Sequence, residues 1–270
     1  MKIFVERNIL VKGRAGMFDF VPPYSATVVE RVLAAGAQIT GSMNEADAFL
    51  GTTKAADYGY YIKPTYGTVS RFGVIAHASS MDQVGISAHE LDTVFHVLRL
   101  IAGHDKNDGT SLPQEKYDYA PPGHELKIAG FGEFDAEAVE AVYMIISASE
   151  FSGNVSRFDG MKFGYRHENY KNADELVINT RSACFSPEMK LHALMGAYVL
   201  SEGQFERYYL KATKVRRIIK QGLERAFESA DAFRVPDMTL AYLTGCPALI
   251  MPDGACYITR EGQEGNFYGI

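Results

Sequence analysis

The most informative segment of the chain is "ADYGYYIKPTYGTVSRFG", residues 56–73. Its second half is rich in turn formers, because Pro64, Gly67 and Gly73 stand among small polar residues. Its first half holds three tyrosines around one glycine and follows neither the helical nor the strand period. We interpret this abrupt change as a seam at which a segment of the chain has been lost.

Upstream of the seam, strand and helix patterns alternate. Residues 2–6, "KIFVE", have the apolar spacing of a short strand. The apolar stripe that follows predicts a helix capped by Ser25 and ended by Gly36. Further strands are expected at 37–40 and 48–51, and this alternation favours an α/β sheet.

Downstream of the seam, the pattern continues with a strand-like stretch at 74–76 and a strongly amphipathic helix. Ser87 and Glu90 have the spacing of a capping box at the start of this helix, and Gly103 is expected to end it. Residues 104–123 are polar and proline-rich, which predicts a long surface loop.

The last half of the chain repeats the alternation without an internal repeat. Asp135 is expected to cap one helix, and Ser186 with Pro187 to begin another. The patterns predict strands at 125–130, 247–252 and 255–259, and helices after Asp135, at 186–200 and at 202–228. We expect residues 1–270 to form a single α/β domain, since 270 residues are ample for one core.

Composition excludes several classes of protein. A net charge of −6 argues against a protein that coats nucleic acid. Three cysteines without a CxxC pair and seven scattered histidines give no zinc-ligand spacing, so no metal and no cofactor are expected. No apolar run approaches the roughly 20 residues of a membrane span, and the first ten residues do not form a signal peptide. We therefore expect a cytoplasmic protein with reduced thiols.

Six segments resemble, in order, the amidase signature family. Within this family the chain is most similar to the A subunit of glutamyl-tRNA(Gln)/aspartyl-tRNA(Asn) amidotransferase. The longest stretches are "VPPYSATVVERVLAAGAQITGSMNEADAFLG" and "IKPTYGTVSRFGVIAHASSMDQVG". The matching segments are 21–51, 62–85, 101–111, 156–166, 180–190 and 208–231, and together they cover most of the chain.

The resemblance implies a fold and a chemistry. The fold is a mixed β-sheet flanked by helices, here in a contracted form. The chemistry is amide hydrolysis by a Ser–cis-Ser–Lys triad, in which lysine activates a hydroxyl that is otherwise a poor nucleophile. In the tRNA enzyme, the A subunit releases ammonia from glutamine for a B subunit that amidates misacylated tRNA, and a small C subunit straps the two together.

The triad is missing from the aligned positions. The family carries a Gly/Ser-rich stretch with both serines where this chain has only 52–62, and the hydroxyls left there are Thr52 and Thr53. Glu6 aligns with the catalytic lysine, and a rival alignment places Lys12 there. Loss of a serine nucleophile costs on the order of 10⁶ in turnover. We therefore expect a pseudoenzyme without glutaminase or amidase activity.

The substrate pocket is also altered. Leu191 and His192 stand where the family's helix carries an arginine for the substrate carboxylate. By the resemblance, Asp237 is the remaining candidate for the aspartate that holds the substrate amine. Asp159 and Tyr165, in the segment "FDGMKFGYR", are further remnants of the pocket.

Two polar residues after the seam allow two readings. Asp82 and Gln83, in "MDQVG", fit either an acid or base in a functional loop or side chains that brace backbone turns, and the second is more common. Glu6 fits either a base in a new reaction or a surface charge.

The leading expectation is a non-catalytic subunit with B-like and C-like partners or in a homo-oligomer. The alternatives are an enzyme of altered chemistry and an amide or amino-acid sensor.

The long helix predicted at 202–228 is rich in cations. One interpretation is a face that follows nucleic-acid phosphates, and the other is a solvated helix face. The acidic whole favours the second, so direct tRNA contact is not expected. The cations are Arg207, Lys211, Lys214, Arg216, Arg217, Lys220 and Arg225.

Overall fold

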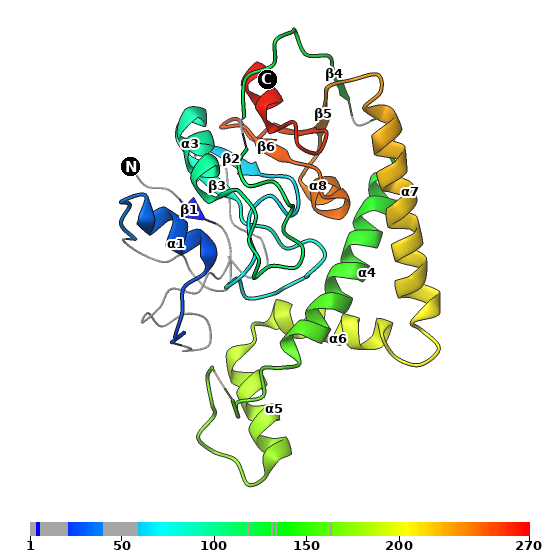
Figure 1. Ribbon diagram of the computed structural model, residues 1–270. Helices are drawn as coiled ribbons and strands as arrows, with labels where there is room; N and C mark the ends of the chain where they lie inside the picture. Colours follow the sequence, from blue (N-terminus) through cyan, green and yellow to red (C-terminus); the bar gives the residue numbers. More distant parts are fainter. Residues whose placement is uncertain are drawn as a thin grey trace.

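A computed structural model gives the arrangement of most of the chain (Figure 1). The predictions at Glu6, Lys12 and residues 48–53 lie outside the part that it describes. Among the described residues, seven strands form one sheet in the order β1-β3-β2-β6-β7-β5-β4. The described residues are 4–5 (backbone only), 21–39, 59–117, 119–130, 132, 134–162 and 164–270.

The sheet is mixed, which confirms the expected fold class. Only β4 and β5 pair in parallel among the described strands, and the other neighbours are antiparallel. The strands at 4–5, 128–130, 248–250 and 256–259 fall within the predicted ranges. The bounds are β1 Phe4–Val5, β2 Tyr60–Lys63, β3 Ile86–Ala88, β4 Ile128–Gly130, β5 Ala232–Val235, β6 Ala248–Ile250 and β7 Cys256–Thr259.

The irregular first half of the seam segment contains strand β2, in the middle of the sheet. Its residue Tyr61 pairs with Ser87 of β3 and with Ile250 of β6. Tyr61 and Ile62 are both buried, one against each face of the sheet. A strand that is buried on both faces lacks the polar–apolar alternation by which strands are found in a sequence, so the pattern missed it.

Helix α1, Thr27–Ala34, begins two residues after the predicted cap. Its N-cap residue is Ala26, which makes no side-chain cap hydrogen bond, so the prediction for Ser25 was wrong. The Thr27 amide donates to the Phe72 carbonyl at 3.2 Å, so a tertiary contact fixes this end of the helix. Gly36 ends the helix with φ +85°, as predicted.

The predicted capping box before helix α3, Leu91–Ile101, is also wrong. Ser87 belongs to β3, and its hydroxyl donates to the Tyr60 carbonyl at 3.0 Å. Glu90 is the N-cap residue and makes no side-chain cap hydrogen bond. Ser87 therefore pairs within the sheet, although the local signal predicts that it caps the helix. The stretch 37–39 forms no strand, and in 74–76 only Val74 makes a β-bridge, which corrects two further predictions.

Local signals predicted three of the later helices, whereas α5 (Ala173–Cys184) and α8 (Thr239–Thr244) were not predicted. Asp135 caps α4 by accepting from the Ala138 amide at 3.1 Å, and Ser186 caps α6, whose first residue is Pro187. The helix predicted from 202 begins at Glu206 as the π-helical segment η3 and continues as α7. The bounds are α4 Ala136–Val155, α5 Ala173–Cys184, α6 Pro187–Val199, η3 Glu206–Leu210, α7 Lys211–Ala226, α8 Thr239–Thr244 and η4 Glu264–Gly269.

Helices cover both faces of the sheet. α4, α7 and α8 pack with one face in one apolar core, and α1 and α3 pack with the other face in a second core. Figure 1 shows α4 and α7 side by side, while α5 extends away from the sheet. The described residues of the loop predicted at 104–123, which are 104–117 and 119–123, form no helix or strand, as predicted, although Asp105, Asp108 and Tyr119 are buried. No described helix has the length and apolar character to cross a bilayer.

Candidate functional site

The loop that follows the seam, residues 76–85, is built around a buried carboxylate. Asp82 accepts from the backbone amides of His77 and Ala78, at 2.9 Å and 3.0 Å. Only 2% of Asp82 is exposed, so both carboxylate oxygens satisfy backbone donors that would otherwise be buried without a partner. This is the geometry of a side chain that braces its own turn.

A buried lysine lies beside this loop, and sequence reasoning missed it. Lys63, at the end of β2, is 1% exposed, and its Nζ donates to Gln83 Oε1 at 2.9 Å and to the Pro64 carbonyl at 3.1 Å. The Tyr242 ring centroid lies 5.8 Å from the same nitrogen. Gln83 is therefore a hydrogen-bond partner of Lys63. No local pattern announces the pair, because 20 residues separate them.

Two helices hold the tip of the loop. Glu150 of α4 accepts from the Ser80 amide at 2.8 Å. Arg216 of α7 donates to the Ser80 hydroxyl at 2.6 Å, to the Ser80 carbonyl at 3.0 Å and to the Leu243 carbonyl at 2.5 Å. Burial lowers the pKa of Arg216 and the nearby Glu150 charge opposes this effect. An arginine remains charged under these conditions, so it acts here as a fixed multiple donor.

A small cavity of about 200 Å³ opens on the other side of the loop. Arg71 and Asp108 face each other across 3.7 Å at this cavity. Burial raises the pKa of Asp108, but hydrogen bonds from the Arg71 and Thr110 amides outweigh it and leave the pKa below its usual value. Arg71 and Asp108 thus form an ion pair at the wall of the cavity, and both oxygens of Asp108 also accept from backbone amides. Its lining is Arg71, Phe72, Val74, Ala76, Ser79, Asp82, Asn107, Asp108 and Gly109.

Two further predicted residues, Asp159 and Tyr165, lie on the connection between α4 and α5. Asp159 accepts from the Met161 amide at 2.8 Å, and Tyr165 packs against the apolar cluster at the end of α4. Ile75, which precedes the loop, joins the same cluster. The structure thus places this connection near the start of the loop, while Asp159 braces a turn of the connection itself.

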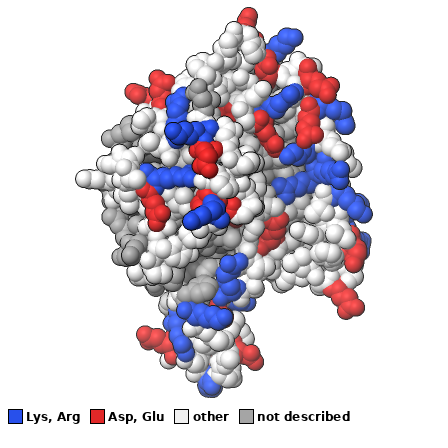
Figure 2. Space-filling model, viewed as in Figure 1, with Lys and Arg blue, Asp and Glu red and all other residues white. Residues whose placement is uncertain are grey.

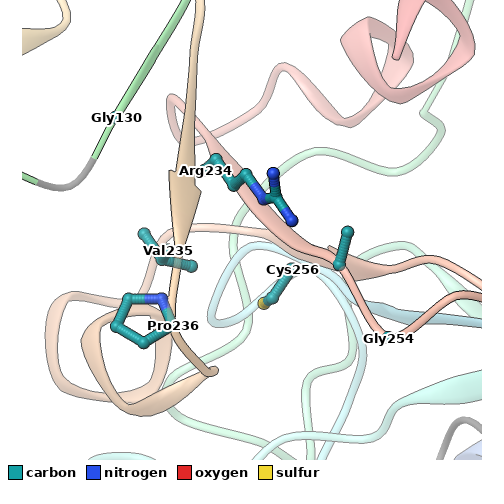
Figure 3. Close-up of a pocket in the computed structure, with 7 residues that line it drawn as sticks. Gly130, Arg234, Val235, Pro236, Gly254 and Cys256 are labelled. Atoms are coloured by element: carbon teal, nitrogen blue, oxygen red, sulfur yellow. The ribbon is translucent and has the colours of Figure 1, made fainter.

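Asp237 lies apart from the loop, at the start of α8. It is exposed and accepts from the Thr239 amide at 2.7 Å. Next to it, a second cavity of about 390 Å³ lies where β4 and β5 end and β7 begins. Figure 3 shows the Arg234 side chain extending from β5 toward the segment of Gly254 and Cys256. The lining is Gly130, Arg234, Val235, Pro236, Gly254, Ala255 and Cys256.

The thiol in this second cavity is not a nucleophile at neutral pH. Burial raises the pKa of Cys256 to about 12, and the Asp237 charge adds to the effect. A thiol is reactive as its thiolate, so this cysteine is inert. Among the described residues, no three His, Cys, Asp or Glu side chains form a group that could hold a metal ion.

Leu191 and His192, which stand where the family resemblance expects an arginine, lie on α6. Leu191 is 57% exposed, whereas His192 is half-buried against Phe151, with ring centroids 6.0 Å apart. Three lysine side chains of the described residues donate hydrogen bonds. Lys63 donates to a backbone carbonyl and to a side-chain amide oxygen, Lys190 to a backbone carbonyl, and Lys220 to a carboxylate. The polar groups that sequence reasoning missed are Lys63, Arg71, Asp108 and Glu150, while Arg216 was named only as one cation of the helix predicted at 202–228.

Comparison with solved structures agrees with this fold. The chain superposes on the A subunit of the glutamyl-tRNA(Gln) amidotransferase of Thermotoga maritima with a TM-score of 0.63 and 21% identity, covering 98% of this chain and 80% of that one. An allophanate hydrolase of Kluyveromyces lactis gives a TM-score of 0.72 at 15% identity, covering 98% and 59%. At such identities the likeness shows the fold alone.

Curated relatives are closer in sequence. The A subunit of the glutamyl-tRNA(Gln) amidotransferase of Lachnoclostridium phytofermentans is 33% identical over 327 residues, covering 87% of this chain and 66% of that protein. The corresponding A subunit of Acinetobacter baumannii is 31% identical over 334 residues, covering 90% and 68%. The chain thus spans about two thirds of the length of these relatives. Because 327 aligned residues exceed the 270 of this chain, the first relative carries residues inside the matched span that this chain lacks.

A family model described as Amidase matches residues 58–134 and 122–245. The match covers more than half of the chain, and its first residue lies within the seam segment. The similarity to the amidotransferase A subunits and the mixed sheet with helices on both faces agree with this match. The chain belongs to the amidase family.

Proposed function

We propose that this protein is a non-catalytic relative of the amidotransferase A subunit. The observation that carries the proposal is the shortened seam: residues 52–62 stand where the family resemblance expects both serines of the triad. The relatives' extra residues inside the matched span support this reading. Without a serine nucleophile, turnover by the family mechanism falls on the order of 10⁶-fold.

The chemistry of the described loop supports the same proposal. Both oxygens of Asp82 are occupied by backbone amides, and Gln83 accepts from Lys63. A general base needs a lone pair directed at a substrate proton, and these groups already use theirs to hold the loop. The hydrogen bonds of Asp82 and Gln83 therefore hold the loop in place.

The role that remains is binding. We infer that the protein associates with B-like and C-like amidotransferase subunits or with a second copy of itself, as a family scaffold without its chemistry. The free thiols Cys184, Cys246 and Cys256 support a reducing compartment, and we place the protein in the cytoplasm. Co-elution with co-expressed B and C subunits in size-exclusion chromatography is expected, and a monomer that never co-elutes contradicts the subunit role.

The decisive experiment measures ammonia release from glutamine and asparagine with the full chain. We expect no release above the buffer blank, while the A subunit of the Thermotoga maritima amidotransferase serves as the active control. Three variants sharpen the result: Lys12→Ala, Glu6→Ala and the pair Thr52→Ala/Thr53→Ala. Ammonia release that any of these variants abolishes would identify a functional hydroxyl–base pair and end the proposal.

The cavity beside Arg71 favours a second candidate function, a sensor of a small amide or amino acid. Its lining combines Arg71, Asn107 and Asp108, polar groups of the kind that fix the orientation of a small ligand. Thermal stabilisation by glutamine or asparagine that Asp108→Asn removes would support it. An enzyme of altered chemistry at this cavity would instead show turnover sensitive to Asp82→Asn.

A further inference from the structure

Arg234 is the charged side chain that lines the cavity at the end of β5. We call the cavity lined by Gly130, residues 234–236 and residues 254–256 the Arg234 cavity. Arg234 is exposed, and its guanidinium forms no hydrogen bond or ion pair with any described residue. By contrast, the Arg216 guanidinium donates to two backbone carbonyls. The donors of Arg234 are therefore available to a ligand. Figure 2 shows where cationic side chains lie on one face of the molecule.

The Arg234 cavity lies at a part of the sheet where ligands are often found. Among the described strands, β4 and β5 are the parallel pair, and both end at the cavity, at Gly130 and Val235. Ligands of open α/β sheets bind outside the carboxyl ends of parallel strands. The cavity volume of about 390 Å³ falls in the range of pockets for small molecules. Position and size therefore both fit a small ligand.

Two glycines leave open space at the wall of the cavity. A Cβ added at Gly130 or at Gly254, both labelled in Figure 3, would meet no atom within 4 Å. Gly254 has a φ of +85° in the turn between β6 and β7, and its amide donates to the Met251 carbonyl at 2.9 Å. The Ala255 amide donates to Asp253 Oδ1 at 2.9 Å. The turn is thus held by its own hydrogen bonds, so this wall keeps its shape without a ligand.

The donors at the wall identify the chemical class of the ligand. A guanidinium presents a planar fork of N–H donors that matches the two oxygens of a carboxylate. Phosphate sites usually add several backbone amides. Here the amides of Gly254 and Ala255 are bonded within the turn, and Pro236 has no amide hydrogen. Much of the remaining wall is apolar, from Val235, Pro236 and Ala255. A carboxylate on an apolar body matches both parts of this lining.

We propose that the Arg234 cavity binds a small apolar monocarboxylate, which Arg234 holds by its two oxygens. Besides burial, the Asp237 charge raises the pKa of Cys256, so a negative charge stands close to this wall. It disfavours a ligand with a second carboxylate, because like charges repel. The Arg234 cavity shares no lining residue with the cavity beside Arg71, so the proposal does not depend on what that cavity binds or on whether the protein hydrolyses amides.

The experiment titrates the full chain with para-fluorobenzoate and with its neutral analogue para-fluorobenzamide, and follows both by fluorine NMR. A probe of this size is expected to bind with a Kd in the millimolar range. The amide should bind at least about tenfold more weakly than the acid, because it lacks the charge-assisted hydrogen bonds to the guanidinium. Arg234→Gln should weaken binding of the acid at least about tenfold, and Arg234→Lys, which keeps the charge without the fork, should weaken it less.

The control removes an exposed arginine elsewhere. Arg207→Gln, on η3, makes the same change in net charge and should keep the affinity for the acid within about twofold of wild type. Ala255→Phe leaves Arg234 in place but fills the cavity, and should abolish binding. Circular dichroism checks that each variant folds. Equal affinity for acid and amide, equal losses in Arg234→Gln and Arg207→Gln, full binding by folded Ala255→Phe, or no saturable binding to wild type would overturn the proposal.

Discussion

The segment 59–85 and the helix pair α5–α6 break the usual rule of burial in opposite ways. In the first, polar side chains are inside: Lys63 is 1% exposed and Asp82 2%. In the second, apolar side chains are outside: Leu191 is 57% exposed and Leu194 68%. Lys63 and Asp82 have hydrogen-bond partners, whereas no described residue covers the leucines.

The two regions therefore differ in whether their unusual side chains find contacts within the described part of the chain. Burying a polar group without a partner costs about 1–3 kcal/mol, so the bonds around 59–85 must be made for the chain to fold. An exposed leucine costs little by itself, but a cluster on one helix marks a surface for association. We expect substitutions in the first region to change folding and substitutions on the outer face of the second to change association.

The largest effect is expected where α6 touches α4. A Cβ at Gly196 would lie 1.9 Å from the Ala148 carbonyl oxygen, a backbone atom that cannot move away alone. Gly196→Ala should therefore lower the free energy of unfolding by about 3 kcal/mol or more, measured by urea denaturation.

The control for this substitution is another glycine, in the helix α4 against which α6 packs. Gly153 lies within α4, and a Cβ added there would meet no atom within 4 Å, so Gly153→Ala should stabilise by about 0.5–1 kcal/mol. If both substitutions have the same sign, close packing of α4 on α6 does not hold the helix pair together.

The second effect tests the buried polar region. Asp82→Ala removes the acceptor of two backbone amides, at His77 and Ala78, and should lower the free energy of unfolding by about 2–3 kcal/mol. Asp159→Ala, which removes an acceptor for one amide at a half-exposed position, is the matched control and should cost less than about 1 kcal/mol. Equal losses would contradict the view that burial makes Asp82 special.

A third, smaller effect concerns acid. Burial raises the pKa of Asp105, but hydrogen bonds from Ser70, Thr27 and the Asn107 amide outweigh it, so the folded pKa lies below its usual value. The ionised form therefore stabilises the fold above the unfolded pKa of about 4, and this stability is lost as pH falls through the folded pKa.

The measurement is urea denaturation between pH 6 and pH 3. Asp105→Asn should destabilise the protein most at pH 6, and the difference from wild type should shrink toward pH 3. Asp174→Asn, on the exposed first turn of α5, is the control. A difference that stays constant with pH would show that the Asp105 charge contributes nothing.

Local chemistry decided which elements the sequence could predict. Asp135 and Ser186 cap their helices within three residues of the donor they satisfy, so the signal is complete in a short window. Ser87 shows the same local signal, yet β3 pairs with β2 and takes its hydroxyl. Strand β2 gave no signal because both of its faces are buried.

The candidate site was predictable only as a list of neighbours in sequence. Asp82 and Gln83 stand in one loop, so their proximity needs no fold. Lys63 and Arg216 reach the same loop from 20 and 136 residues away, and no spacing rule links such positions. The charge of α7 was readable as a composition, but the inward position of Arg216 required the packing of α7 against the loop.

The smallest effect on stability tests the uncovered surface of α6. Leu191 and Leu194 stand one helical turn apart and are more than half exposed, so Leu191→Ser/Leu194→Ser should change the free energy of unfolding by less than about 1 kcal/mol. The same variant should reduce association with co-expressed partner subunits or with a second copy, measured by light scattering during size-exclusion chromatography. Ile218→Ser, which removes an exposed apolar side chain from α7, is the control. A large loss of stability with unchanged association would mean that the leucines are covered within the chain, and the contrast between the two regions would then disappear.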